Sequence, residues 1–260
     1  MLGQSGYLLY IMQFIPAIIL ISFLASFIRS AFGFGEALVA VPLLALLLPL
    51  SVAVPLALML SVSIALLILI QDHQHIHLKD AKALILSAIP GIPLGLFLML
   101  QVEEQWTKLL LGLFIAVFAL YSLQKPVVKK QPHQKRTVLL ILMGFLSGVL
   151  GGAYGLNGPP LVFYGDRAGW NATQFRATLQ AYFLPASGIA LLCFFAKSLV
   201  TPIVCYDFLV ALPAALPAIY LGRWLNAKLS TRLFFKVVYL LLLLIGILLL
   251  IHSLIGKLAW

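Results

Sequence analysis

Residues 144–164 read GFLSGVLGGAYGLNGPPLVFY, and this stretch decides how the chain folds. Glycine adds backbone entropy to the unfolded chain and proline lacks an N–H donor, so neither supports an ordinary helix. Within the membrane, a backbone segment without helical hydrogen bonds is tolerated only where protein or a water-filled cavity surrounds it. The stretch therefore predicts a broken helix inside a membrane protein, at the residues that interrupt its apolar run: Gly148, Gly151, Gly152, Gly155, Gly158 and Pro159–Pro160.

Composition places the whole chain in the membrane. Hydrophobic residues make up 63% of its 260 residues and charged residues 9%, and the mean hydropathy is +1.12. A soluble domain of this size needs more charge on its surface. Apolar runs of about 20 residues, the length that spans a bilayer, recur from end to end. We therefore expect an all-α polytopic membrane protein whose +10 net charge reflects basic loops facing the lipid surface, with no nucleic-acid partner.

The first half of the chain holds a weaker copy of the same stretch. Residues 23–42 read FLASFIRSAFGFGEALVAVP, in which Gly33 corresponds to Gly155 at an offset of 122 residues. Farther along, Gly95 corresponds to Gly222 at an offset of 127 residues, and an Asp and a Pro precede both at matching positions. These matches indicate an internal duplication, with chance matching among apolar residues as the alternative.

The duplication divides the chain into an N-terminal transmembrane repeat (1–124), a basic linker (125–136) and a C-terminal transmembrane repeat (137–260). Five hydrophobic segments are expected in each repeat, one of them broken or re-entrant, so the second repeat enters the membrane inverted. A cytoplasmic linker leaves 14 of the 17 basic residues on the cytoplasmic side, as the positive-inside rule requires. Inverted repeats are typical of transporters. The expected segments are 7–28, 37–48, 52–70, 83–100, 109–123, 138–156, 159–164, 177–196, 203–221 and 234–251.

Two helix starts are the candidate anion site. Asn157 is a strong N-cap and Pro159 suits the first helical turn. A helix N-terminus offers free N–H groups and about half a positive charge, which suits an oxyanion. The corresponding start in the first repeat follows Gly33 and Gly35. The alternative is close helix packing, because Gly148/Gly152 and Gly151/Gly155 have the GxxxG spacing.

Three polar residues lie near these starts, and two of them, Glu36 and Arg176, allow more than one interpretation. Glu36 is the acid within an apolar stretch; it either carries a coupling proton or pairs with Arg29 or Arg176, or it caps its own short helix. Arg176 and Gln180 lie one helical turn apart and share a face. Arg176 either binds the anion through its planar fork of donors or anchors the helix at the membrane edge.

The sequence gives little support for a metal site, a disulfide framework or an intramembrane enzyme. His73, His75 and His77 alternate in a loop, which fits a solvated loop better than a zinc site. Cys193 and Cys205 have no disulfide framework or metal-ligand spacing. The sequence has no HExxH or GxSxG motif, so an intramembrane enzyme is disfavoured. We expect no catalytic residues, no metal and no cofactor.

The paired glycine-rich breaks followed by proline, one per half and separated by a basic loop, resemble the sulfite exporter TauE/SafE family over residues 15–251. The resemblance implies a bacterial inner-membrane protein that exports sulfite, sulfoacetate or other organosulfonates. The first copy differs from the usual break, since Arg29, Ser30 and Glu36 occupy positions where small residues are usual.

Together these observations predict a secondary transporter, an exporter of a small anion by alternating access, with an anion channel or a carrier of small carboxylates as alternatives. Its partners are the small anion, a coupled proton or sodium ion, the bilayer and a second copy in a homo-oligomer. The predicted substrate-binding residues are Ser30, Gly33, Gly35, Glu36, Tyr154, Gly155, Asn157, Gly158, Arg176 and Gln180.

Overall fold

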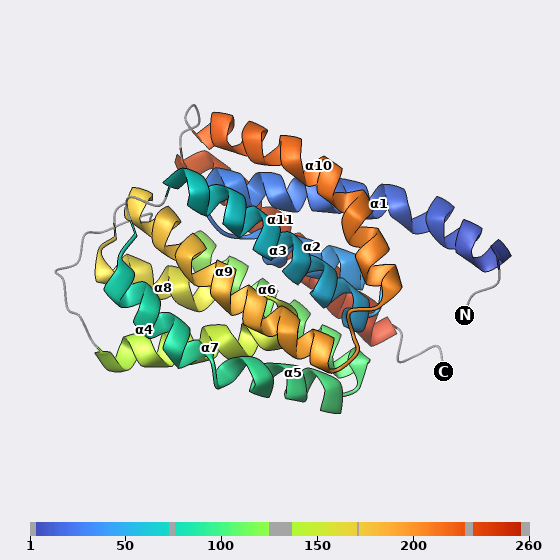
Figure 1. Cartoon of the computed structure of the whole chain (residues 1–260), viewed down its shortest axis with the longest axis horizontal. Helices are drawn as coiled ribbons and strands as arrows, with labels where there is room; N and C mark the ends of the chain where they lie inside the picture. The colour runs from blue at the N-terminus through green and yellow to red at the C-terminus, as the bar shows by residue number, and fades with distance from the viewer. Residues whose placement is uncertain (1–3, 73–75, 125–136, 171, 227–230, 256–260) are drawn as a thin grey trace.

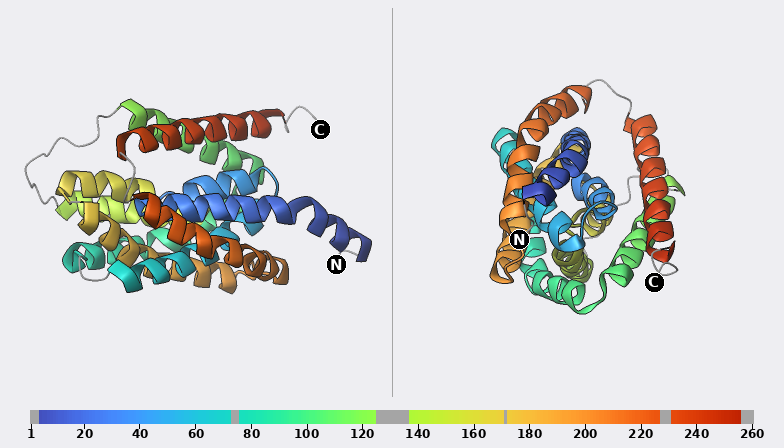
Figure 2. Two further views of the ribbon diagram at one scale, coloured as in Figure 1. Left: turned by 90° about the horizontal axis from the view of Figure 1, so that it is seen from above. Right: turned by 90° about the vertical axis from the view of Figure 1, so that its right-hand side faces the viewer.

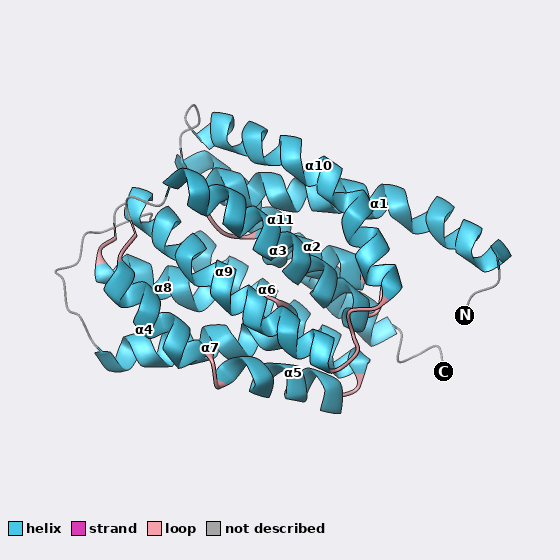
Figure 3. Ribbon diagram, viewed as in Figure 1, coloured by secondary structure: helices cyan, strands magenta, loops and turns pink. Residues whose placement is uncertain are grey.

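The computed structural model describes residues 4–72, 76–124, 137–170, 172–226 and 231–255. All regular structure in these ranges is helical (Figure 3). The predicted linker, residues 125–136, lies outside the described residues, as do His73 and His75. The helices are α1 (Gln4–Phe32), α2 (Glu36–Ala45), α3 (Leu50–Asp72), α4 (Leu78–Ala88), α5 (Gly91–Gln101), α6 (Glu104–Gln124), α7 (Thr137–Tyr154), α8 (Gly158–Ala168), α9 (Ala172–Ala196), α10 (Pro202–Asn226) and α11 (Thr231–Ile255).

The all-α polytopic class is confirmed. The longer helices run roughly along the long axis of the molecule (Figure 1). Seven segments among the described residues are long and apolar enough to cross a membrane. Their exposed surface is rich in leucine, phenylalanine and isoleucine, as lipid contact requires. The spans are Phe14–Phe32, Leu50–Ile70, Leu78–Gln101, Glu104–Gln124, Thr137–Tyr154, Gln174–Ala196 and Pro202–Trp224.

Three boundaries differ from the sequence prediction. The first segment was expected to end at residue 28, but α1 continues to Phe32, because Gly33 is the first residue with a positive φ. The segment expected at 83–100 is divided into α4 and α5 near Pro90. Pro93 contributes there, since it lacks the N–H that would bond to the carbonyl four residues earlier. The stub expected at 159–164 is a longer helix, α8.

The most extensive helix contacts join a helix of one half of the chain to a helix of the other half. Helix α1 lies along α10, and α7 lies along α4 and α5; α3 packs on α9, and α6 packs on α11. The end-on view in Figure 2 shows α6 and α11 together at one side of the molecule, with α1, α2 and α3 near its centre. Each half is therefore held mainly by the other half.

The glycines of α7 do not break the helix, contrary to the sequence prediction. Helix α7 continues through Gly148, Gly151 and Gly152 and ends at Tyr154. Gly148 lies against the backbone of Ala88, closer than any side chain would allow, and Gly152 lies in the same way against the backbone of α5. Small residues let two backbones approach within the membrane. The packing interpretation therefore holds for Gly148 and Gly152.

One close contact occurs twice, once in each half. A Cβ on Gly95 of α5 would overlap the carbonyl oxygen of Val149 in α7. A Cβ on Gly222 of α10 would lie 2.5 Å from the carbonyl oxygen of Phe27 in α1. Phe27 and Val149 are 122 residues apart, the same offset that relates the two helix breaks. The repeated contact supports the inference of an internal duplication.

We expect Gly95→Ala and Gly222→Ala to destabilise the protein to a similar degree, because each methyl group would enter the backbone of the neighbouring helix. Overpacking of this kind costs about 1–3 kcal/mol. The measurement is thermal unfolding of the detergent-purified protein. Gly188→Ala is the matched control, since a Cβ there meets nothing within 4 Å. Identical unfolding temperatures for all three variants would contradict the described packing.

Candidate functional site

Two helix breaks face each other near the centre of the molecule: residues 33–35 between α1 and α2, and residues 155–157 between α7 and α8. Both contain glycine with a positive φ, 80° at Gly33, 99° at Gly35 and 68° at Gly155. Residues with a side chain rarely adopt this conformation, so glycine is required there. A Cβ on Gly158 would lie 3.5 Å from the ring of Phe34, which brings the two breaks into contact.

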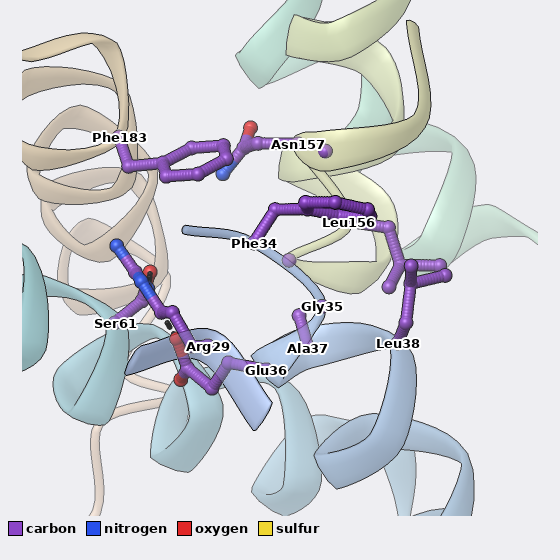
Figure 4. Close-up of a pocket in the computed structure, with 12 residues that line it drawn as sticks. Arg29, Phe34, Gly35, Glu36, Ala37, Leu38, Ser61, Leu156, Asn157 and Phe183 are labelled. Atoms are coloured by element: carbon purple, nitrogen blue, oxygen red, sulfur yellow. Dashed lines mark hydrogen bonds and ion pairs between the residues drawn. The ribbon is translucent and has the colours of Figure 1, made fainter. Parts of the chain in front are cut away.

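A small pocket lies between the breaks (Figure 4). Helices α2 and α8 both begin at this pocket, so the positive ends of two helix dipoles meet there. One part of the wall is polar and the other apolar. The polar residues are Arg29, Glu36, Ser61 and Asn157; the apolar ones include Phe34, Leu38, Leu156 and Phe183.

Arg29 is the centre of the polar wall and is only 2% exposed. Its Nη1 donates to Oε2 of Glu36 in a buried ion pair, and to Oγ of Ser61 at 2.6 Å. Its Nη2 donates to Oε1 of Gln180 at 2.8 Å. The guanidinium also lies 4.9 Å from the centre of the Phe183 ring. A buried charge is tolerable only when it is paired and hydrogen-bonded, and Arg29 meets both conditions.

A serine pair extends the network to the second break. Ser61 of α3 and Ser187 of α9 are hydrogen-bonded, with 3.2 Å between their Oγ atoms. The Nδ2 of Asn157 donates to the same Ser187 at 3.3 Å. Ser147 Oγ donates to the Asn157 carbonyl at 2.6 Å. Polar contacts thus lead from the start of α2 to the start of α8.

Of the ten predicted binding residues, five line the pocket: Gly35, Glu36, Gly155, Asn157 and Gly158. Gly33 and Gln180 belong to the same network, and Arg176 lies beside it. Gln180 Nε2 donates to the Gly33 carbonyl at 2.7 Å. Arg176, one turn before Gln180, packs across Gly33, where a Cβ would lie 3.2 Å from its Cγ. That contact places Arg176 beside the first break.

Ser30 and Tyr154 lie outside the pocket lining. Ser30 Oγ donates to the Ile219 carbonyl of α10 at 2.5 Å, and Tyr154 donates to the Thr107 carbonyl of α6 at 3.1 Å. Both residues precede a glycine break, but the helical rotation at the end of α1 and α7 directs their side chains to neighbouring helices.

Asn157 occupies the predicted N-cap position without acting as a cap. Its backbone is helical (φ −74°, ψ −22°) and its side chain makes no capping hydrogen bond. The side chain instead covers Gly151, where a Cβ would lie 2.8 Å from Asn157 Cγ. Gly151 is therefore small because it makes room for Asn157, a third role beside helix breaking and helix packing.

Sequence reasoning did not place Arg29, Ser61, Ser187 or Phe183 in the site. A signal for the serines was present, because Ser61 and Ser187 are 126 residues apart, between the two offsets of the repeat. Glu36 was correctly considered as a partner of Arg29, and that pairing is confirmed. Glu36 does not cap α2 with its side chain, since its Oε1 has no hydrogen-bond partner among the described residues.

The described residues contain no group of three or more histidine, cysteine or acidic side chains that could hold a metal. His77 stacks on Trp170 with 6.2 Å between ring centres. The polar side chains in the pocket wall, Arg29, Glu36, Ser61 and Asn157, can form ion pairs and hydrogen bonds.

Comparison with known proteins identifies the family to which this chain belongs. The family model described as "Sulfite exporter TauE/SafE" matches residues 18–249. A curated protein of Cupriavidus necator, described as "Probable sulfite/organosulfonate exporter TauE", is 26% identical over 143 residues, which is 54% of this chain and 56% of that protein. The chain thus spans just over half the length of the curated relative it matches. No solved structure matches.

We expect Arg29→Met to destabilise the protein by about 3–5 kcal/mol, because it leaves the Glu36 carboxylate buried without a partner. The double variant Arg29→Met/Glu36→Leu should recover much of that loss. Thermal unfolding in detergent measures both. Lys108→Met is the matched control, because it removes an ion pair to the half-exposed Glu104 and should cost less than about 1 kcal/mol. If Arg29→Met and Lys108→Met unfold alike, the buried pair does not stabilise the fold.

Proposed function

This chain belongs to the sulfite exporter TauE/SafE family, and we propose that it is a secondary transporter that carries a small oxyanion, sulfite or an organosulfonate, across the membrane. The observation that carries the proposal is the pocket between the two helix breaks, with a buried arginine in its wall. Its polar wall suits an oxygen-rich anion.

The electrostatics of the pocket support an anionic substrate. The starts of α2 and α8 both carry partial positive charge, and the wall holds the guanidinium of Arg29, which in this structure is paired with the Glu36 carboxylate. The apolar wall beside them, including Phe34 and Phe183, would contact a short organic group. Broken helices whose N-termini point at an anionic group near the bilayer midplane are a recurrent arrangement in secondary transporters.

The contacts between helices of the two halves support alternating access. The pocket lies where the α1–α2 and α7–α8 breaks meet, and Ser61 contacts Ser187 across the α3–α9 contact. In the proposed cycle, two halves of opposite orientation rock about this contact and open the pocket to one side at a time. Residues 1–124 and 137–260 are the proposed halves.

The proposed location is a bacterial inner membrane, with residues 125–136 in the cytoplasm. The family match supports the bacterial inner membrane, and the orientation is proposed from the distribution of basic residues. A membrane potential that is negative inside favours the exit of an anion that moves without a coupled proton by about 2.3 kcal/mol per charge at 100 mV. A coupled proton or sodium ion is the further expected partner, together with a second copy of the chain.

A channel is the alternative function, because broken helices also form ion filters. The pocket lining contains one arginine and one glutamate rather than a ring of like charges. A carrier of small carboxylates is the alternative substrate class, since a carboxylate and a sulfonate present similar oxygens to a guanidinium. Saturation and competition separate these alternatives.

We expect proteoliposomes with the wild-type protein to take up or release sulfite or a sulfonate with saturable kinetics. Asn157→Ala should lower the maximal flux at least tenfold, because it removes the polar side chain at the start of α8. Lys108→Met, which lies outside the pocket, is the control for reconstitution. Flux that rises linearly with concentration would support the channel, and saturable flux restricted to carboxylates would replace the proposed substrate.

A further inference from the structure

We propose that the substrate anion binds Arg29 in the place that the Glu36 carboxylate occupies in this structure, and that Glu36 takes up a proton when it is displaced. This inference rests on the proposed function, since it assumes that the pocket binds an anion. It assigns Arg29 as the anion's ligand and Glu36 as a carboxylate that occupies the site when the anion is absent.

The ion pair between Arg29 and Glu36 is incomplete on both sides. Glu36 uses one oxygen, Oε2, and its buried Oε1 has no hydrogen-bond partner among the described residues. The described bonds of Arg29 use its Nε–H, both Nη1 hydrogens and one Nη2 hydrogen, which leaves one of five donors. Guanidinium and oxyanion groups pair best through two parallel bonds. An anion with three oxygens can complete this arrangement.

The rest of the guanidinium is held in position independently of Glu36. Gln180 accepts from both Nε and Nη2, at 3.3 and 2.8 Å, and is itself fixed by its bond to the Gly33 carbonyl. Phe183 covers one face of the group. Removal of the Glu36 carboxylate would therefore leave Arg29 oriented toward the pocket, with Ser61 beside it as a second donor.

Charge balance requires the proton. Arg29 and Glu36 together carry no net charge, so an added anion would bury one uncompensated negative charge. Arg29 and Glu36 are the ionisable groups among the described residues of the lining. Ser61 from α3, Phe183 from α9 and Asn157 before α8 cannot take up a proton, and Gln180 behind Arg29 cannot either. Helices α6 and α11, which also pack on α2, give no residue to the lining, and the charged Arg176 packs across Gly33.

The exchange balances as follows. One anion and one proton enter from the same side; the anion forms hydrogen bonds to Arg29, and the proton binds a carboxylate oxygen of Glu36 to give the neutral acid. The net charge of the pocket is zero before and after. Release of the anion returns the proton, and the Glu36 carboxylate pairs with Arg29 again. Anion and proton therefore move together.

The test is the binding of methanesulfonate to the detergent-purified full chain, because a sulfonate stays ionised over the whole pH range used. Calorimetric titration gives Kd at several pH values, and a pH indicator in weak buffer counts protons. For the wild type we expect uptake of about one proton per anion, and a Kd that rises about tenfold per pH unit over the pH range in which Glu36 is ionised in the free protein and protonated in the complex.

Two variants are compared with the wild type, one that tests the role of Glu36 and one that serves as its control. Glu36→Gln should bind with no proton uptake and with a Kd independent of pH. Glu103→Gln makes the same chemical change at an exposed carboxylate and should retain the wild-type pH dependence. Binding by the wild type without proton uptake, or proton uptake retained in Glu36→Gln, would overturn the inference while leaving the transport function intact. If neither methanesulfonate nor any other anion of the transport panel binds the wild type, the proposed function fails and the inference fails with it.

Discussion

The burial of one positive charge in the membrane constrains the whole centre of this protein. Arg29 is held by groups from three other elements, Glu36 at the start of α2, Ser61 of α3 and Gln180 of α9. The contact with Glu36 needs the α1–α2 break, because only a chain that turns at Gly33 and Gly35 brings the glutamate back to the arginine seven residues earlier. The break, the ion pair and the pocket are therefore one structural unit.

The sequence was sufficient for the class, for the presence of a helix break in each half and for several members of the site, but not for every residue at which a helix ends. Membrane spans follow from composition and length alone, and breaks after Phe32 and Tyr154 follow from glycines with positive φ. The role of Gly148 could not be predicted, because a glycine inside an apolar run can break a helix or admit a neighbour, and only the position of Ala88 decides between them. Arg29 was similarly ambiguous, since an arginine at the end of an apolar run also suits the membrane edge.

The two halves share a plan but differ in chemistry. At the offset of 122 residues Arg29 corresponds to Gly151, and Glu36 corresponds to Gly158. In the second half the carboxamide of Asn157 lies over Gly151, so a neutral polar group occupies the region where the first half has an ion pair. The ion pair in the pocket lining comes from the first half alone, which is compatible with the single anion proposed for the pocket.

The bond between Ser61 and Ser187 has a consequence for the history of the chain. A residue that touches its own counterpart must lie on the axis that relates the two copies. If the halves arose by gene duplication, and if Ser61 and Ser187 occupy equivalent positions in the two copies, this bond once joined one serine to the same serine of a second molecule. The ancestor would then have been a half-length protein that inserted into the membrane in both orientations and formed an antiparallel pair. Fusion would have fixed that pair in a single polypeptide and left each half free to acquire its own polar residues.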